Sequence, residues 1–490
     1  MSQALNANFM GLPVEEVVPD AAMVKGVSRS SLLTGRRRVR LQPQTGVNYG
    51  NASATPSSTN SAANSIIQFV LADSSSLLDL NSAVLSCTVT TGGTGDIALD
   101  DGPSFIRRAT IALNGTNIDD TDLANRWANA QVYAGADRSW YTGAGSFAGY
   151  WQANPALNTA GSTYPPTSYA VGDVSGALVS ASVRYKAGVQ LAYPLALVSK
   201  FFGTKQYLPL SQCGELVVQL LCATNAEACI QRSGNTDGGY VLSNVFLEVD
   251  MVQPHYLYAE MLNRVTQLEG EQGLVVPYNA VISAQGQSIT TSGQANIVTS
   301  LATNNLRKVV VTMSPIAEAT INYPICSAFG NHALTGLQFR CGSLYFPSQE
   351  AVNTGSIFWT SQSAFNGGDP IHMRNGVMDI ATFSKTTGPQ PVGFNVTSIY
   401  NPTSASNTNG QKQYFADSCV IAYGFDNYKG GEPLDADGIS VLGQAGSQLV
   451  TLLRVAPNGT YFTSGIIPNI HLERTRYIVL KNGALRVEGV

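Results

Sequence analysis

Charged side chains are scarce in this chain. Of its 490 residues, 12% are Asp, Glu, Lys or Arg, against roughly 25% in an average globular domain. The formal net charge of −4 does not by itself imply binding to nucleic acid or to a membrane. Because 44% of the residues are hydrophobic, the chain can bury a large core, and its polar surface must come from Ser, Thr, Asn, Gln and Gly. This composition is typical of an all-β protein whose surface is partly covered by neighbours.

Signals for export and for disulfide bonding are also missing. The N-terminus lacks a charged start followed by an apolar core, so we expect no signal peptide, and no apolar run reaches the length of a membrane span. The seven cysteines are odd in number, irregularly spaced and without a Cys-x-x-Cys pair. They indicate reduced, buried thiols in a protein that folds in a reducing compartment and is not secreted.

Catalytic motifs are equally hard to find. The four histidines are scattered, and none has the spacing of a metal site. Neither a phosphate-binding loop nor a G-x-S-x-G nucleophile motif occurs. Asp435 and Asp437 suggest calcium only weakly, because such a loop needs more ligands. We therefore expect no enzyme, no cofactor and no metal.

Residues 1–60 have the composition of a flexible arm. Their basic residues all lie between positions 21 and 40 and include the run Arg36, Arg37, Arg38 and Arg40. A small, polar stretch follows as far as residue 60. Such arginines can neutralise phosphates of DNA or of an anionic membrane. The alternative is an arm that docks under neighbouring subunits, with its arginines paired to acids or solvated.

From residue 61 the pattern changes to short strands. In the stretch 187–222, apolar residues alternate through Val189–Leu197 and again through Leu216–Cys222. A period of two predicts strands with one buried face, and Pro194 and Pro209 suit strand ends or corners. The stretch therefore predicts two paired strands at one edge of a β-sandwich.

A long aromatic insertion, residues 135–186, precedes that strand pair. It includes Trp140, Tyr141, Phe147, Tyr150 and Trp151. A connection of this length inside a compact domain is normally functional or is ordered by neighbours. Packing between subunits is one interpretation and receptor or glycan contact the other, because exposed aromatic residues mark interaction surfaces.

The second half repeats the plan of the first. The segment FIRRATIALNG (105–115) has a strand and a glycine turn, and a short helix capped by Asp119, Asp120 or Thr121 is predicted to follow it; LTGLQFRCGSLYF (334–346) has a similar order. Helical spacing in residues 254–272 predicts a connector between the halves. The predicted domains are an arm at 1–60, β domains at 61–253 and 273–490, and the helical connector between them.

This order resembles that of the double-jelly-roll major capsid proteins. The resemblance rests on the arm, the Leu113-Asn114-Gly115 turn, the long loop and the Tyr207-Leu208-Pro209-Leu210 segment. That family occurs in virophages, polinton-like viruses, nucleocytoplasmic large DNA viruses and the adenovirus hexon lineage. The resemblance implies an all-β fold of two tandem eight-stranded jelly rolls, with short helices in the loops and an N-terminal arm.

The resemblance also implies a function and a set of partners. Three chains would form a pseudo-hexagonal homotrimer that tiles an icosahedral DNA-virus shell beside neighbouring capsomers, penton proteins and minor capsid proteins. The aromatic insertion would be a crown or intersubunit loop. The arginine run would lie on the inner surface, as a candidate contact to packaged DNA or an inner membrane. The protein would be located in the virion and assembled inside the host cell. The alternative is a β-sandwich carbohydrate-binding protein, adhesin or glycan-active enzyme.

Overall fold

The computed structural model of the chain describes most of the predicted strands. The described residues are 33–50, 64–92, 97–137, 140, 144–150, 188–231, 239–256, 258–259, 262–263, 274–300, 303, 305–315, 326–327, 329–366, 378, 380–384, 419–425, 438–441, 448–456, 465–481 and 484–489.

Two antiparallel sheets face each other in the first half. One has the order β1-β11-β3-β7, with the short β8 also pairing with β3, and the other has the order β2-β9-β5-β6. A separate pair is formed by β4 and β10. Their bounds are β1 Leu33–Leu41, β2 Ile66–Leu71, β3 Leu77–Gly92, β4 Ile97–Leu99, β5 Ile106–Leu113, β6 Thr116–Asp122, β7 Val189–Pro194, β8 Tyr207–Pro209, β9 Leu216–Cys222, β10 Cys229–Gln231 and β11 Gly239–Pro254.

The second half contains another pair of facing sheets. Their orders are β12-β19-β14-β17, with β20 added to β19, and β13-β18-β15-β16. Their bounds are β12 Leu274–Gln285, β13 Gly293–Ser300, β14 Leu306–Pro315, β15 Gly336–Cys341, β16 Leu344–Ala351, β17 Ile421–Gly424, β18 Gln448–Val455, β19 Ile466–Lys481 and β20 Ala484–Glu488.

The two halves share one topology. Within the described residues each half has eight main strands, and in both halves the first sheet takes the first, eighth, third and sixth of them, while the second sheet takes the second, seventh, fourth and fifth. Strands β1, β6 and β11 therefore correspond to β12, β16 and β19. This is the jelly-roll arrangement of two sheets, and it confirms the predicted fold of two tandem jelly rolls.

Alternation of apolar and polar residues explains why these strands form. In β5, for example, Ile106, Ala109, Ile111 and Leu113 are buried, and the residues between them lie on the outer face or in partly covered positions. The inner faces of the paired sheets close over these side chains. Most buried apolar residues of both halves form one continuous cluster, which includes Trp127 and Tyr278.

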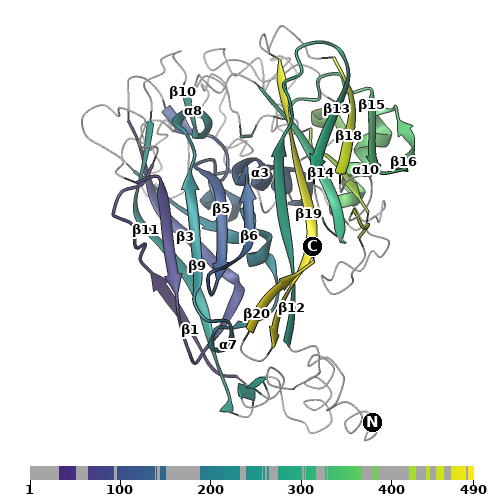
Figure 1. Cartoon of the computed structure of the whole chain (residues 1–490). Coiled ribbons are helices and arrows are strands. Elements are labelled where there is room, and N and C mark those ends of the chain that lie inside the picture. The colour runs from purple at the N-terminus through teal and green to yellow at the C-terminus, as the bar shows by residue number, and fades with distance from the viewer. Residues whose placement is uncertain are drawn as a thin grey trace, which may run out of the picture.

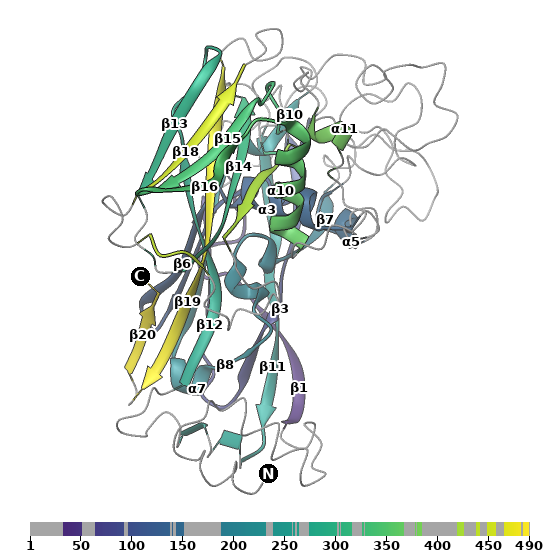
Figure 2. The same cartoon turned by 90° about the vertical axis from the view of Figure 1, so that its right-hand side faces the viewer.

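The jelly rolls stand side by side, with helices between and beside them (Figures 1 and 2). Helix α3 lies at the junction and contacts α10 of the second half. Nearly all of its residues are buried, as expected for a helix covered on all sides. The helices are α3 Ala124–Gly135, α5 Ala144–Phe147, α7 Leu210–Cys213, α8 Asn225–Ala228, α10 Thr354–Asn366 and α11 Ile380–Phe383, and the 3-10 turns are η3 Leu195–Leu197 and η4 Lys200–Gly203.

The prediction of a flexible arm is wrong for residues 33–41. Residues 33–41 form β1, which pairs with β11 over its whole length and is the first strand of the jelly roll. The side chains of Val39 and Leu41 pack against the core. The run of arginines concealed this strand, because its apolar alternation begins only after Arg38.

Two local predictions also need correction. Strands β7 and β9 both form, but β7 pairs with β3 and β9 pairs with β2 and β5, so they belong to opposite sheets. Asp119 and Asp120 do not cap a helix. Both lie in β6, and α3 begins after Leu123, which has left-handed φ of 51° and no side-chain cap. Most of the predicted connector 254–272 lies outside the described residues.

Candidate interfaces between domains and subunits

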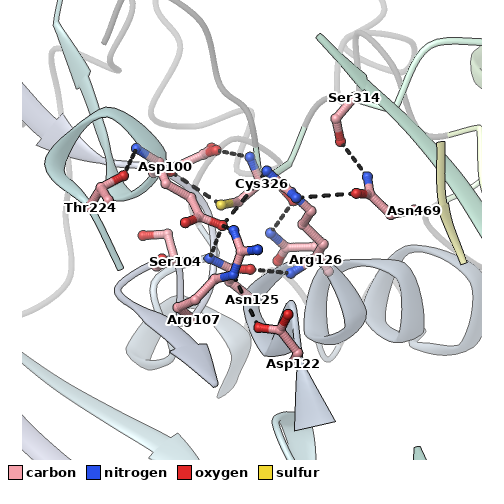
Figure 3. Close-up of polar contacts among 12 residues, drawn as sticks. Asp100, Ser104, Arg107, Asp122, Asn125, Arg126, Thr224, Ser314, Cys326 and Asn469 are labelled. Atoms are coloured by element: carbon pink, nitrogen blue, oxygen red, sulfur yellow. Dashed lines mark hydrogen bonds and ion pairs between the residues drawn. The ribbon is translucent and has the colours of Figure 1, made fainter. Parts of the chain in front are cut away.

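A buried carboxylate of the first jelly roll binds the backbone of the second. The side chain of Asp100 accepts hydrogen bonds from the backbone N–H of Cys326 at 2.8 Å and of Ser327 at 3.2 Å, and from the Ser327 hydroxyl. Asp100 is only 1% exposed. Figure 3 shows this carboxylate facing Cys326. It therefore fixes a segment of the second half to the first.

A second cluster surrounds Glu227, which is also buried. Its Oε1 accepts hydrogen bonds from Arg107 Nη1 at 3.0 Å and Asn125 Nδ2 at 3.1 Å, and Arg126 Nη2 lies 3.7 Å away. The other amino group of Arg126 donates to Asn469 Oδ1 of β19 at 3.1 Å (Figure 3). The fully buried arginine thus connects a carboxylate of one jelly roll to an amide of the other.

The strand edges of the two jelly rolls also meet. The backbone carbonyl of Ile118 in β6 accepts hydrogen bonds from Tyr278 Oη of β12 at 2.7 Å and from Arg476 Nη1 of β19 at 2.8 Å. Strand β6 is the last in its sheet, so its outward carbonyls have no strand partner among the described residues. Side chains of the second jelly roll satisfy this carbonyl instead, as a buried edge requires.

Burial perturbs the carboxylates at this junction. It raises the pKa of Asp100 to about 6, although the hydrogen bonds from Ser327 and neighbouring amides favour the charged form. It raises the pKa of Asp119 to about 7, against the opposing effects of the Ser199 hydroxyl and the Arg476 charge. A buried carboxyl without a full countercharge is expected to behave in this way.

Basic residues gather around a third buried acid, Glu473 of β19. Its carboxylate lies 3.3 Å from Lys308 Nζ. Burial alone would raise the pKa of Glu473, but the charges of Lys308, Lys200 and Arg307 together lower it. Burial lowers the pKa of Lys200, whose Nζ lies 5.8 Å from the centroid of the Trp127 ring. These residues come from both halves, so charge as well as apolar packing joins the jelly rolls.

The sequence-predicted arginines lie on β1, at the edge of the first sheet. Their side chains remain half or more exposed, between 50% and 64%. Each is paired within the chain: Arg36 with Asp79 and Asp250, Arg37 with Asp73, and Arg38 and Arg40 with Glu248. Four acids therefore face four arginines, and the patch is electrically balanced. Contact of these arginines with DNA or a membrane stays a prediction.

The predicted aromatic loop residues separate in the structure. Tyr150 is fully buried, Trp140 packs partly against the core with its ring centroid 5.8 Å from that of Tyr150, and Phe147 is 55% exposed. Tyr141 and Trp151 lie outside the described residues. Tyr150 is therefore a core residue in this chain, and the role of the others in a crown or intersubunit contact stays a prediction.

Sequence reasoning did not find the junction residues. Asp100 lies in a loop, the neighbours Asn125 and Arg126 lie in α3, and Glu227 lies in α8, so no short sequence spacing connects all four. These residues share one property: each is a polar side chain buried among apolar ones. That property can be recognised only in the folded structure, where the two halves meet.

The described residues give no support for a metal site, a membrane-spanning helix or a reactive cysteine. Among them, no group of three His, Cys, Asp or Glu side chains is placed to hold a metal, and no helix is long and apolar enough to cross a bilayer. All seven cysteines are buried free thiols. Burial raises the pKa of Cys213 and of Cys222 to about 12, so these thiols are poor nucleophiles.

Comparison with known proteins identifies the class of fold. No protein-family profile and no curated protein sequence matches the chain. Among solved structures, PBCV-1 VP54, as fitted into a cryo-EM reconstruction of the virophage Sputnik, is similar with a TM-score of 0.56 and 11% identity, covering 94% of this chain and 97% of VP54. The PBCV-1 capsid gives a TM-score of 0.53 at 12% identity, covering 94% and 97% of the two chains.

The structure of the Sputnik virophage itself is also similar. Its TM-score is 0.54 at 11% identity, and the match covers 93% of this chain and 89% of the Sputnik chain. The chain therefore has the double-jelly-roll fold that these viral capsid proteins share, along almost its entire length. At this level of identity, the likeness shows the fold alone.

Proposed function

We propose that this chain is a major capsid protein, a structural protein that assembles with copies of itself into a virion shell. The observation that carries the proposal is the repeated jelly roll, which matches viral capsid structures along more than nine-tenths of the chain. Two domains of one topology in a chain give a trimer six similar edges, so a trimer can fill a hexagonal position in a shell.

The junction between the jelly rolls supports this role. A capsomer must hold its two domains in one fixed arrangement if neighbouring capsomers are to meet regular edges. Buried contacts at Asp100, Arg126 and Ile118 hold the domains together, and an apolar core runs through both. The mechanism is therefore geometric: rigid units bury surface against one another, and no chemical step is required.

The proposal also includes the partners that such a capsid protein would contact in the virion. Neighbouring capsomers would contact the outer sheet faces, and penton and minor capsid proteins would occupy positions where the regular lattice changes. Packaged DNA or an inner membrane would meet the inner surface, with the first 60 residues as the candidate contact. The carbohydrate-binding, adhesin or glycan-active alternative has no specific observation in its favour.

The oligomeric state of the purified chain tests the proposal. Size-exclusion chromatography with light scattering should give three times the mass of the 51.8 kDa chain, and negative-stain class averages should show a hexagonal outline with threefold symmetry. A stable monomer at micromolar concentration would contradict the proposal.

A further inference from the structure

The first strands of the two jelly rolls, β1 and β12, are held in different ways. Strand β12 lies against β6 of the other jelly roll, and four of its apolar side chains are buried: Val276, Tyr278, Ala280 and Val281. In β1, none of the side chains described at 35–41 is more than partly buried, and only Val39 and Leu41 pack against the core. Burial of apolar surface, the dominant favourable term in folding, therefore contributes little to holding β1.

Ion pairs hold β1 in addition to its backbone pairing with β11. Three of its arginines alternate along the strand, so they lie on the face opposite the two apolar side chains. Two carboxylates of β11, Glu248 and Asp250, pair with all three at distances between 2.5 and 3.0 Å. Arg37 pairs with Asp73 at 2.6 Å. Because the arginine side chains are half or more exposed, each pair is weak and is screened by salt.

The chain is anchored separately just after β1. Tyr49 is fully buried; its backbone N–H donates to the Leu242 carbonyl at 3.0 Å, and the Leu242 N–H donates to the Tyr49 carbonyl at 2.8 Å. Thr45 Oγ1 donates to the Ile66 carbonyl at 2.8 Å. On its outer side, β1 pairs with no strand among the described residues, and Figure 2 shows it beside β11 on the outside of the first jelly roll. Residues 33–41 can therefore leave the sheet without disturbing the contacts that follow them.

Separation of β1 from β11 uncovers two surfaces of opposite charge. The four arginines lose their carboxylate partners and become available to other anions. The open edge of β11 is left with the acids that faced them, which are Asp73, Asp79, Glu248 and Asp250. Charged side chains on an edge oppose pairing with unrelated strands. The acidic edge therefore favours the return of the basic strand that belongs there.

We propose that β1 is a releasable strand, which opens from β11 as a unit while the rest of the first jelly roll stays folded. Elements with few buried apolar contacts open locally at a lower free energy than global unfolding, and salt sets how often β1 opens by screening its ion pairs. In the closed state the acids occupy the arginines, so any contact of the arginines with another anion follows opening. The inference concerns a single chain and goes beyond the proposed function.

Hydrogen exchange of the full-length protein, followed by mass spectrometry, tests this opening. The amides of β1 that bond to β11 are compared with those of β12 that bond to β19, at about 0.1 M and about 1 M NaCl, where the screening length falls from about 10 Å to about 3 Å. The variant Glu248→Gln removes the carboxylate that pairs with Arg38 and Arg40. The matched control is Asp120→Asn, which breaks the surface pair with Arg108 in the same jelly roll.

We expect the β1 amides of the wild type to exchange about threefold faster or more at the higher salt concentration, with the β12 amides unchanged. Glu248→Gln should speed β1 exchange at low salt and reduce its salt dependence, whereas Asp120→Asn should match the wild type. Brief trypsin digestion gives a second readout, because cleavage after Arg38 or Arg40 tracks the open population.

Two results would overturn the releasable strand. One is equally slow exchange of β1 and β12 at both salt concentrations, and the other is parallel acceleration of both strands in Glu248→Gln, which would show that β1 opens only with the whole protein. A monomer in light scattering would contradict the proposed function and leave this inference standing.

Discussion

At the scale of single residues, the junction between the jelly rolls depends on carboxyl groups that are buried without a full countercharge beside them. Asp100 and Asp119 belong to the first jelly roll, and both lie against the second. Asp100 is surrounded by N–H and O–H donors, so its charge is spread over several hydrogen bonds. In both groups burial is the largest cause of the raised pKa, and the hydrogen bonds that each carboxyl accepts oppose it only in part.

The stability of the protein should therefore depend on Asp119 near neutral pH. Its pKa is raised from 3.8 to about 7 in the folded protein, so the folded state retains a proton that the unfolded state has lost. This stabilisation is fully present below pH 3.8 and is lost as the pH rises through about 7, because between these two values the unfolded state binds fewer protons than the folded state.

Comparison with Asp119→Asn measures that effect. Between pH 5 and 8, the melting temperature of the wild type should fall relative to that of the variant, which cannot ionise at this position. Buried His332 and His471, whose pKa values are lowered by burial to about 4 and about 3, act equally in both proteins and cancel. Parallel curves over this range would contradict the assignment.

The four arginines show the limit of residue-level prediction. Their presence in one run was readable from the sequence, and so was the alternative that acids would pair with them. The partners themselves could not be identified, because Asp250 and Glu248 lie more than 200 positions further along the chain and approach only through strand pairing.

At the scale of elements, alternation predicted most strands correctly, including Val189–Pro194 and Leu216–Cys222. It could not assign them to a sheet, because a period of two describes one buried face and not the strand that lies beside it. Turns η3 and η4 and helix α7 carry the chain from one sheet to the other. Pro194 and Pro209 correctly indicated a corner between the two strands. The prediction that both strands lie at one edge of the sandwich was wrong.

Strand β1 gives an element-scale prediction with a built-in control. Removing residues 1–32 leaves β1 complete, whereas removing residues 1–45 deletes it and uncovers the edge of β11. Loss of the partly buried Val39 and Leu41 should destabilise the first jelly roll by about 2 kcal/mol or more. Urea denaturation should therefore show a lower midpoint for the longer truncation alone, and equal midpoints would contradict the role of β1 as a core strand.

At the scale of the whole molecule, the order of elements and the plan of two tandem jelly rolls were predictable, whereas the pairing of individual strands was not. The two halves are similar in the order and type of their elements and not in close sequence, and the eight main strands described in the second half follow the order of those in the first. Many different sequences with the same hydrophobic alternation can adopt one topology. The two jelly rolls can therefore share a strand order without sharing residues. The polar junction escaped prediction because it exists only between the two completed domains.

Calorimetry of Asp100→Asn tests whether the two jelly rolls behave as one unit. The new amide directs its own N–H groups toward the donors from Cys326 and Ser327, and each buried donor left without an acceptor costs about 1–3 kcal/mol. We expect a single unfolding transition in the wild type and a lower melting temperature in the variant. Asp120→Asn is the control, because the half-exposed Asp120 pairs with Arg108 at the surface and such pairs contribute about 1 kcal/mol or less. Two separate transitions in the wild type would contradict a shared junction.

The pairing of β1 with β11 has a consequence for synthesis. Leu33 lies opposite Pro254, and in the second half Leu274 lies opposite Leu480. Each jelly roll therefore closes its first sheet only after its last strand has left the ribosome, and contacts this distant in sequence form slowly. During that interval β1 has no β11 to pair with. We expect the four arginines between positions 36 and 40 to discourage this unpaired strand from pairing with other nascent chains, because charged side chains on an edge strand oppose such pairing.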